Sequence, residues 1–389
     1  MWHKFLLFLT KCFLQCQSAA ATSSPWENFD PQQVVRVLLI SMTGLGDTLF
    51  STPALRAVKT TYPTWQIDFL CHQRWPALLS HNPYINQIFV YPGRNWRLIS
   101  LAQALRRKNY DLVIILHGND PEATLLAFLT KAPYIIGSGK SPLAFVYAAK
   151  IAISDPYEHA IERRLNYVRC CGADTPEKQM DIFLPRDCLD KADAILAKNF
   201  GRTPKLLIAL HPTGSGAYKW WPQEYYIRLG TQLYQEHQAD LLIISGKSDR
   251  VVAEAIAQQI PGPSLVTGGR FSLLAVAGLL SKCRLFVGND SGPLHMALAL
   301  GIPSLALIGA DHPSRIGPYE VEWGKFLYRK PEVCSFEPCL TKRCSCHRCM
   351  QAISVEEVLH LLKQWWEPRF LSSGAVDQQF QASRQVLDL

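Results

Sequence analysis

Short runs of aliphatic and β-branched residues alternate with longer amphipathic stretches over most of this 389-residue chain. Alternation of this kind is typical of β-α-β units, in which helices separate buried parallel strands. It is clear at 34–116, weakens between 151 and 204, and then resumes. Because the pattern occurs twice in a chain too long for one typical domain, it predicts two doubly wound α/β domains. The predicted strands are 34–41, 66–71, 87–91 and 111–116, then 205–210, 239–245, 284–288 and 303–309.

The same pattern predicts how the chain is divided. The segments are a leader (1–33), a first domain (34–200), a second domain (201–368) and a polar tail (369–389). The stretch 186–200 is predicted to be a linker helix ending at Gly201, since glycine commonly follows the last helical residue. In the leader, Lys11 divides the apolar residues into two pieces too short to span a bilayer. The leader therefore fits a membrane-surface anchor, a segment outside the fold, or a cleaved signal.

Charge and cysteine content narrow the class of function. The formal net charge is +8, and the Lys and Arg residues are scattered. Scattered basic residues suit an anionic ligand or membrane surface better than nucleic acid, which needs a basic stripe. Seven of the twelve cysteines are dispersed, which is typical of reduced cytoplasmic thiols. The other five lie between 334 and 349, where a structural thiol cluster is favoured over a metal site formed by Cys339, Cys344, Cys346 and Cys349.

A glycine-rich turn follows the first predicted strand. In LLISMTGLGDTLF (38–50), a strand ends and a helix begins near Asp47. Gly44 and Gly46 allow backbone amides to approach a ligand closely. A dinucleotide fingerprint would need a third glycine where Leu49 stands, so a nicotinamide-dependent oxidoreductase is disfavoured. Spacing leaves Asp47 open to two interpretations, a general base at the edge of the sheet or a helix cap.

Two loops in the second half can bind phosphate. In ALHPTGSGAYKWWP (209–222), hydroxyls and amides can donate to phosphate oxygens and Lys219 adds a positive charge, although a lysine before a helix is often only solvated. In VGNDSGPLHMALALG (287–301), a helix begins at the Ser-Gly-Pro turn, and its amides and dipole favour an anion. We expect Asp290 to bind sugar hydroxyls or brace the turn. The candidate ligand-binding residues are Thr213, Gly214, Ser215, Gly246, Asp290, Ser291, Gly292 and His295.

These motifs, in this order, resemble those of glycosyltransferase family 9, the ADP-heptose:lipopolysaccharide heptosyltransferases and their relatives. The resemblance runs from about Val35 to Val358 and is most specific in GLGDTLFSTPALRAVKTTYP (44–63), HPTGSGAYKWWPQE (211–224) and VGNDSGPLHMALALGIPSLALIG (287–309). It implies a GT-B fold, in which two Rossmann-like domains face a cleft, the first binding the acceptor and the second the nucleotide sugar. Thr213 departs from the glycine that many relatives have in the phosphate loop, and the leader lies outside the family core.

The resemblance also implies a reaction. That reaction is an inverting, metal-independent transfer of heptose or a similar sugar from ADP-heptose or a related donor to a lipopolysaccharide-like or other glycan acceptor, with no cofactor. Asp47 matches the family's proposed general base, Lys219 the lysine that contacts the diphosphate, and Asp290–His295 the donor motif D-S/T-G-x-x-H. The expected location is the cytoplasm or, peripherally, the inner face of the cytoplasmic membrane. A non-catalytic nucleotide-sugar-binding protein of the same fold is the alternative.

Overall fold

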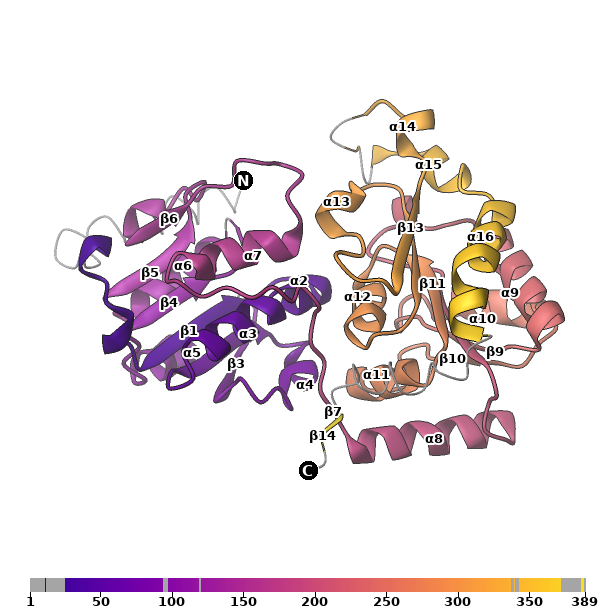
Figure 1. The fold of residues 1–389 in the computed structure, drawn as a ribbon, viewed down its shortest axis with the longest axis horizontal. Coiled ribbons are helices and arrows are strands. Elements are labelled where there is room, and N and C mark those ends of the chain that lie inside the picture. The colour runs from indigo at the N-terminus through magenta and orange to yellow at the C-terminus, as the bar shows by residue number, and fades with distance from the viewer. Residues whose placement is uncertain are drawn as a thin grey trace. The chain divides into compact units, whose positions relative to one another are not determined.

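Two compact units, 1–178 and 179–389, make up the chain in this computed structural model (Figure 1). The structure describes residues 11, 25–93, 97–118, 120–336, 339, 343–371 and 386–387. The predicted linker helix is α8 (Arg186–Phe200), and Gly201 ends it with a φ of 67°. The Cys188 thiol of α8 donates to the carbonyl of Leu274 in α11 (Leu273–Ser281) at 3.3 Å. Because α8 packs on α11, residues 179–200 belong to the second unit in the structure, not to the first.

The first unit contains a six-stranded parallel sheet in the order β3-β2-β1-β4-β5-β6. Its strands are β1 (Arg36–Ser41), β2 (Gln66–His72), β3 (Gln87–Tyr91), β4 (Leu112–Ile115), β5 (Tyr134–Ser138) and β6 (Ala149–Ile151). Right-handed crossovers put the helices after β1 and β2 on one face and those after β3 and β4 on the other. The first face carries α2 (Leu45–Phe50), α3 (Thr52–Thr61), α4 (Pro76–Leu79) and α7 (Ala160–Arg169), and the second carries α5 (Arg97–Arg106) and α6 (Pro121–Leu129).

The second unit repeats this topology, with its six parallel strands in the order β10-β9-β8-β11-β12-β13. The strands are β8 (Leu207–His211), β9 (Asp240–Ile243), β10 (Ser264–Val266), β11 (Leu285–Asn289), β12 (Ser304–Ile308) and β13 (Gly324–Tyr328). One face packs against α9 (Gln223–His237), α10 (Arg250–Gln259) and α16 (Val355–Leu361), and the other against α11 and α12 (Gly292–Ala299). The short helix α13 (Pro313–Ile316) follows β12, and α14 (Lys330–Val333) and α15 (Arg348–Gln351) follow β13. The π-helical stretch η6 (Leu362–Leu371) follows α16.

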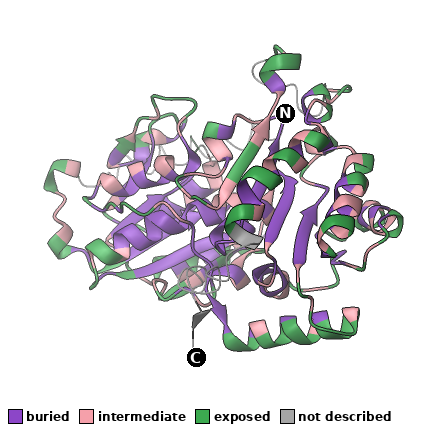
Figure 2. Cartoon of the chain, turned by 45° about the vertical axis from the view of Figure 1, so that its right-hand side comes forward, coloured by how far each residue is buried: buried purple, intermediate pink, exposed green. Residues whose placement is uncertain are grey.

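The central strands of both sheets are buried, as their purple colour in Figure 2 shows. Burial on two faces explains why these strands appear in the sequence as continuous apolar runs. The strand order reverses between β1 and β4 in the first sheet and between β8 and β11 in the second. Doubly wound sheets bind ligands at such a reversal, beyond the carboxyl ends of the strands. The predicted α/β class with two Rossmann-like units is therefore confirmed.

The two ends of the chain are described only in part. The predicted leader lies outside the described residues except for Lys11 and 25–33, where η1 (Trp26–Asn28) and η2 (Pro31–Gln33) are short turns. Most of the predicted polar tail also lies outside them. Across the described part of the chain, every helix is too short or too polar to cross a bilayer.

Candidate functional site

Asp47 lies in the first turn of α2, directly beyond the carboxyl end of β1. Its Oδ2 accepts a hydrogen bond from the Gly44 amide at 3.3 Å, so the carboxylate caps the helix. Its Oδ1 lies 2.6 Å from Nη2 of Arg164. The Asp47 side chain is nevertheless 43% exposed, whereas that of Arg164 is 6% exposed. The cap and the ion pair therefore hold the carboxylate in place while leaving it accessible.

Arg164 is the buried partner of Asp47, and the sequence did not indicate this pairing. It extends from α7, donates through Nε to Ser51 Oγ at 3.2 Å and through Nη1 to the Ala160 carbonyl at 2.8 Å, and lies 5.5 Å from the ring centroid of Phe50. Burial lowers the pKa of its guanidinium, and the charge of Asp47 opposes that effect. Since 117 positions separate Arg164 from Asp47, no local motif could have paired them.

The two glycines of the α2 turn have different positions. Gly44 is exposed and precedes the helix, and a Cβ atom there would lie 3.3 Å from Oδ2 of Asp47. That contact is tighter than most, so a side chain at 44 would disturb the capping carboxylate. Gly46 is half-buried within α2.

In the second unit, the loops after β8 and β11 come together. A Cβ atom placed on Gly214 would lie 3.9 Å from Cβ of Ser291 and 4.0 Å from Cβ of Lys219. Asn289, the last residue of β11, joins the two loops. Its Nδ2 donates to the Thr213 carbonyl at 3.1 Å, and its Oδ1 accepts from the Trp221 amide at 3.1 Å and from the Tyr226 hydroxyl at 3.1 Å. Sequence reasoning missed this bridging role, which required knowing that β8 and β11 are neighbours.

Lys219 lies at the centre of a charged cluster. Its Nζ is 2.5 Å from Oδ2 of Asp290 and 3.3 Å from Oδ2 of Asp311. Burial would lower the pKa of Lys219, but the two carboxylates together raise it. Burial would raise the pKa of Asp290, but a hydrogen bond from His295 and the charge of Lys219 lower it overall. Arg315 Nη1 lies 3.4 Å from Oδ1 of Asp311. The structure therefore brings Lys219, Asp290 and His295 together and adds Asp311, which the motif did not include.

The remaining candidates differ in burial and in hydrogen-bond partners. Thr213 Oγ1 is buried and has no hydrogen-bond partner within the described ranges. Ser291 precedes α12, which begins at Gly292, but its hydroxyl donates to the Asn289 carbonyl at 3.2 Å and does not cap the helix. Within the described part of the chain, the first amides of α12 therefore have no side-chain cap. Ser215 is exposed in the loop after β8, and Gly246 is exposed beyond β9.

The cysteine cluster does not gather into a compact metal site. Sγ of Cys344 lies 4.0 Å from Sγ of Cys346, while Cys349 is buried, and burial with neighbouring thiols raises its pKa to about 11. Cys339 is half-buried nearby in the sequence. Among the residues that the structure describes, one group brings three possible ligand atoms within 4.8 Å of one another, and it is Glu236, His237 and Glu367. Lys363 Nζ lies 3.1 Å from Glu236 there, so that group already has a cation as its partner.

Comparisons with known proteins agree with the topology and the motifs. A family model described as glycosyltransferase family 9 (heptosyltransferase) matches residues 98–346, which include the loops of Lys219 and Asp290 but begin after Asp47. Lipopolysaccharide heptosyltransferase 1 of Pseudomonas aeruginosa is 26% identical over 327 residues, covering 80% of this chain and 88% of the relative. The glycosyltransferase family 9 structure from Veillonella parvula superposes with a TM-score of 0.74 at 22% identity, covering 86% of this chain and 97% of that one. Heptosyltransferase WaaC of E. coli with ADP gives 0.67 at 21% identity, covering 85% and 99%. The chain therefore belongs to glycosyltransferase family 9 (heptosyltransferase) and is a glycosyltransferase that uses a nucleotide sugar.

Proposed function

We propose that this protein transfers heptose, or a similar sugar, from ADP-heptose or a related nucleotide sugar to a lipopolysaccharide-like or other glycan acceptor, with inversion at the anomeric carbon. The observation that carries the proposal is the junction of the loops after β8 and β11, where Lys219 pairs with Asp290 two residues before α12 begins. An ammonium group beside uncapped helix amides suits a diphosphate. The names of the relatives support this choice, because the P. aeruginosa protein is a lipopolysaccharide heptosyltransferase and the E. coli structure contains ADP.

Donor binding requires Lys219 to exchange one carboxylate for a phosphate. The Asp290 side chain is 9% exposed and holds Nζ at 2.5 Å, whereas that of Asp311 is 37% exposed and lies at 3.3 Å. Because the longer and more exposed ion pair is the weaker one, the diphosphate replaces Asp311, and Asp290 continues to orient Lys219. The buried hydroxyl of Thr213, which has no partner in the described structure, is a further donor for a phosphate oxygen in the same loop.

In the proposed chemical step, Asp47 is the general base. The acceptor oxygen attacks the anomeric carbon, its proton passes to the Asp47 carboxylate, and the bond from the anomeric carbon to the diphosphate breaks with its electron pair leaving on the phosphate. One displacement of this kind inverts the configuration. The ion pair with Arg164 and the hydrogen bond from Gly44 fix the direction of the carboxylate, which is what a positioned base requires.

Charge stabilisation without a metal is the remaining part of the proposal. Negative charge develops on the departing diphosphate, and Lys219 with the amides at the start of α12 supplies fixed positive charge for it. We therefore expect transfer to continue at an unchanged rate when EDTA is added. A rate that falls with EDTA and returns with Mg²⁺ would contradict metal independence without affecting the assignment of the donor site.

A nucleotide panel tests the proposal directly. A ligand that binds only the folded protein raises its melting temperature, so ADP and ADP-heptose should raise the Tm of the unfolding transition of the second unit more than UDP or GDP does. Product release from ADP-heptose with a heptose-deficient lipopolysaccharide acceptor should follow, and NMR of the product should show the inverted anomer. No Tm response to any adenine nucleotide would refute the donor assignment. A Tm response without transfer would favour the non-catalytic alternative.

A further inference from the structure

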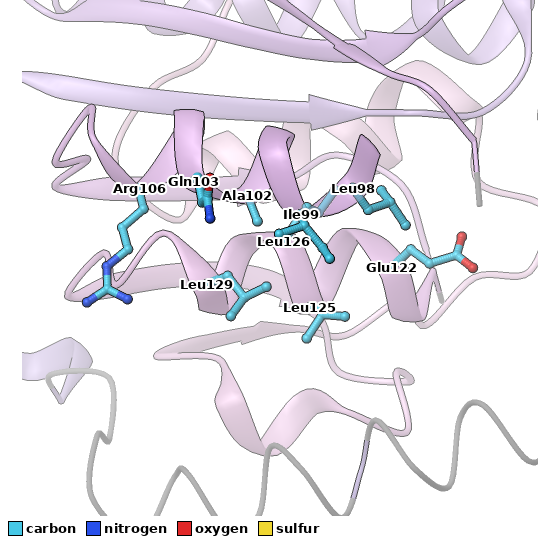
Figure 3. A pocket seen from close by; sticks show the side chains of 9 residues that line it. All are labelled: Leu98, Ile99, Ala102, Gln103, Arg106, Glu122, Leu125, Leu126 and Leu129. Carbon is cyan, nitrogen blue, oxygen red and sulfur yellow. The ribbon is translucent and has the colours of Figure 1, made fainter. Parts of the chain in front are cut away.

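An apolar groove of about 310 Å³ lies on the outer side of the helix pair α5 and α6 in the first unit. Figure 3 shows its walls, which consist of leucine, isoleucine and alanine side chains from both helices, with Arg106 at one end and Glu122 at the other. The apolar lining residues are Leu98, Ile99, Ala102, Leu125, Leu126 and Leu129.

Helix α5 carries more apolar surface than its packing on the sheet requires. Leu101 and Leu105 are buried in the core of the unit, which is the single apolar stripe that a surface helix normally has. Ile99 is 67% exposed, and Leu98 and Ala102 beside it are only half-buried. A continuous apolar surface that the described fold does not cover indicates an interaction site.

One end of the groove, where Arg106 lies, is basic. Between residues 97 and 109 the sequence contains four Lys and Arg residues and no Asp or Glu, and Arg106 and the adjacent Arg107 are exposed. Among the described residues that line the groove, Glu122 provides the one carboxylate, and it accepts a hydrogen bond from the Tyr91 hydroxyl at 2.9 Å. An apolar surface with arginines at one end is complementary to an anionic lipid surface, because the apolar side chains can enter the acyl boundary while the guanidinium groups bind lipid phosphates.

The position of the groove within the unit fits such a surface. Helices α5 and α6 begin after the carboxyl ends of β3 and β4, at the same edge of the sheet where Asp47 follows β1. Leu98 and Glu122 lie in the first turns of these helices, so this end of the groove opens toward that edge. An acceptor held in a lipid layer would thus reach the carboxylate from the side on which the groove ends.

We propose that the α5–α6 groove is the surface by which this enzyme binds an anionic membrane. The inference rests on the proposed function, with a lipopolysaccharide-like acceptor, and its partner is a bilayer that contains anionic phospholipid. Ile99 and the neighbouring leucines enter the interface, and Arg106 and Arg107 contact phosphate groups. Each arginine is expected to strengthen binding to anionic vesicles about fivefold.

Vesicle binding by the full chain tests this surface. Sedimentation with vesicles of phosphatidylglycerol and phosphatidylcholine is compared with vesicles of phosphatidylcholine alone. We expect Arg106→Gln with Arg107→Gln to weaken binding to the anionic vesicles about 25-fold, and Ile99→Asp to weaken it about tenfold or more. The matched controls are Val251→Asp, which changes a valine that is 77% exposed on α10, and Lys198→Gln with Lys205→Gln, two exposed lysines of the second unit. Both controls should bind as the wild type does.

The outcomes separate this inference from the proposed function. Transfer to a short, water-soluble acceptor should be unchanged in the groove variants, because the groove contributes no group to the reaction. Asp47→Asn should bind vesicles normally. The inference is overturned if the groove variants sediment as the controls do, which would leave vesicle binding to another part of the chain. It is also overturned if Ile99→Asp converts a dimer to a monomer in light scattering, since a second copy would then cover the groove.

Discussion

Replacing Asp47 by asparagine removes the proposed base with almost no change of shape. The substituted side chain keeps an oxygen for Arg164, which donates to Oδ1 at 2.6 Å, but its amide nitrogen then faces the Gly44 N–H that Oδ2 accepts at 3.3 Å. A neutral amide oxygen cannot accept the proton of an attacking hydroxyl. The loss of a positioned general base typically reduces a rate about 10²- to 10⁴-fold. We expect a fall of this size in kcat, with the affinity for the donor unchanged because the donor residues belong to the second unit.

The same substitution has a calculable effect on stability. Exchanging a charge-assisted hydrogen bond for a neutral one costs about 1 kcal/mol, and losing the cap costs about 1 kcal/mol. The Arg164 side chain is 6% exposed, so the loss of the Asp47 charge beside it adds to this cost in stability. The addition is small, because Asp47 is 43% exposed and solvent already screens the ion pair. A total of about 2–3 kcal/mol corresponds to a fall in Tm of roughly 4–12 °C for a unit of this size. The variant should therefore be folded at 25 °C and measurable.

The assay must separate lost chemistry from lost stability. Asp111→Asn is a matched control, because Oδ2 of Asp111 accepts from the amides of Val35 and Arg36 at 2.9 and 2.8 Å at the start of β1, the edge of the sheet opposite Asp47. We expect Asp111→Asn to lower the Tm by a comparable amount and to transfer sugar normally. Single-turnover transfer, measured as release of nucleoside diphosphate, supplies the rate. If Asp47→Asn retains more than about one tenth of the wild-type rate, the general-base role is refuted.

Two further predictions concern the second unit. Burial lowers the pKa of His211 to about 4, so between pH 6.5 and 4 the unfolded state binds the proton that the folded state excludes, and stability is lost as the pH falls. In urea titrations, the free energy of unfolding of this unit should decrease by up to about 2 kcal/mol between pH 7 and 5. The variant His211→Asn should lose this pH dependence, and its amide can still donate to the Ile244 carbonyl as Nδ1 does at 2.8 Å. Asp311→Asn should bind ADP about fivefold more tightly by calorimetry, because it removes the carboxylate that competes with phosphate for Lys219. An affinity that falls would mean that Asp311 contacts the ligand and does not compete with it.

The parts of the fold that were predictable are those with a strong local signal. β1, β4, β8 and β11 lie at the centres of the sheets and are continuous apolar runs, so the sequence located them within one or two residues. The strands β5, β6, β10 and β13 were missed, because β6, β10 and β13 are outer strands and the apolar run of β5 is shortened by Gly137 and Ser138. β6 is the three residues Ala-Lys-Ile, too few for any periodicity, and β13 is partly exposed with Lys325 as its second residue. Their pairing is determined by the neighbouring strand, which is tertiary information.

The candidate site likewise has residues that the sequence predicts and residues that it does not. The turn-forming residues around them predicted that Gly44, Asp47, Lys219 and Ser291 follow the ends of strands, because the conformation of such turns is determined by adjacent residues. The partners that fix these side chains lie far away in the sequence, Arg164 at 117 positions from Asp47 and Asp311 at 92 from Lys219. Each partner lies on an element whose position depends on how the sheet is ordered, so its role appears only when the topology is known.

The two charged groups of the proposed reaction, Asp47 and Lys219, are held in place in the same way, each by an ion pair with a buried partner. Asp47 is an accessible anion fixed by a buried cation, and Lys219 is a largely buried cation fixed by the buried anion Asp290 and by the more exposed Asp311. In each case a buried, hydrogen-bonded partner fixes the direction of the functional group. An oriented group loses less conformational freedom when substrate arrives than a free side chain would, which leaves more of the interaction energy for the transition state. This is why the distant partners, and not the motif residues by themselves, determine whether the motifs can act on a sugar.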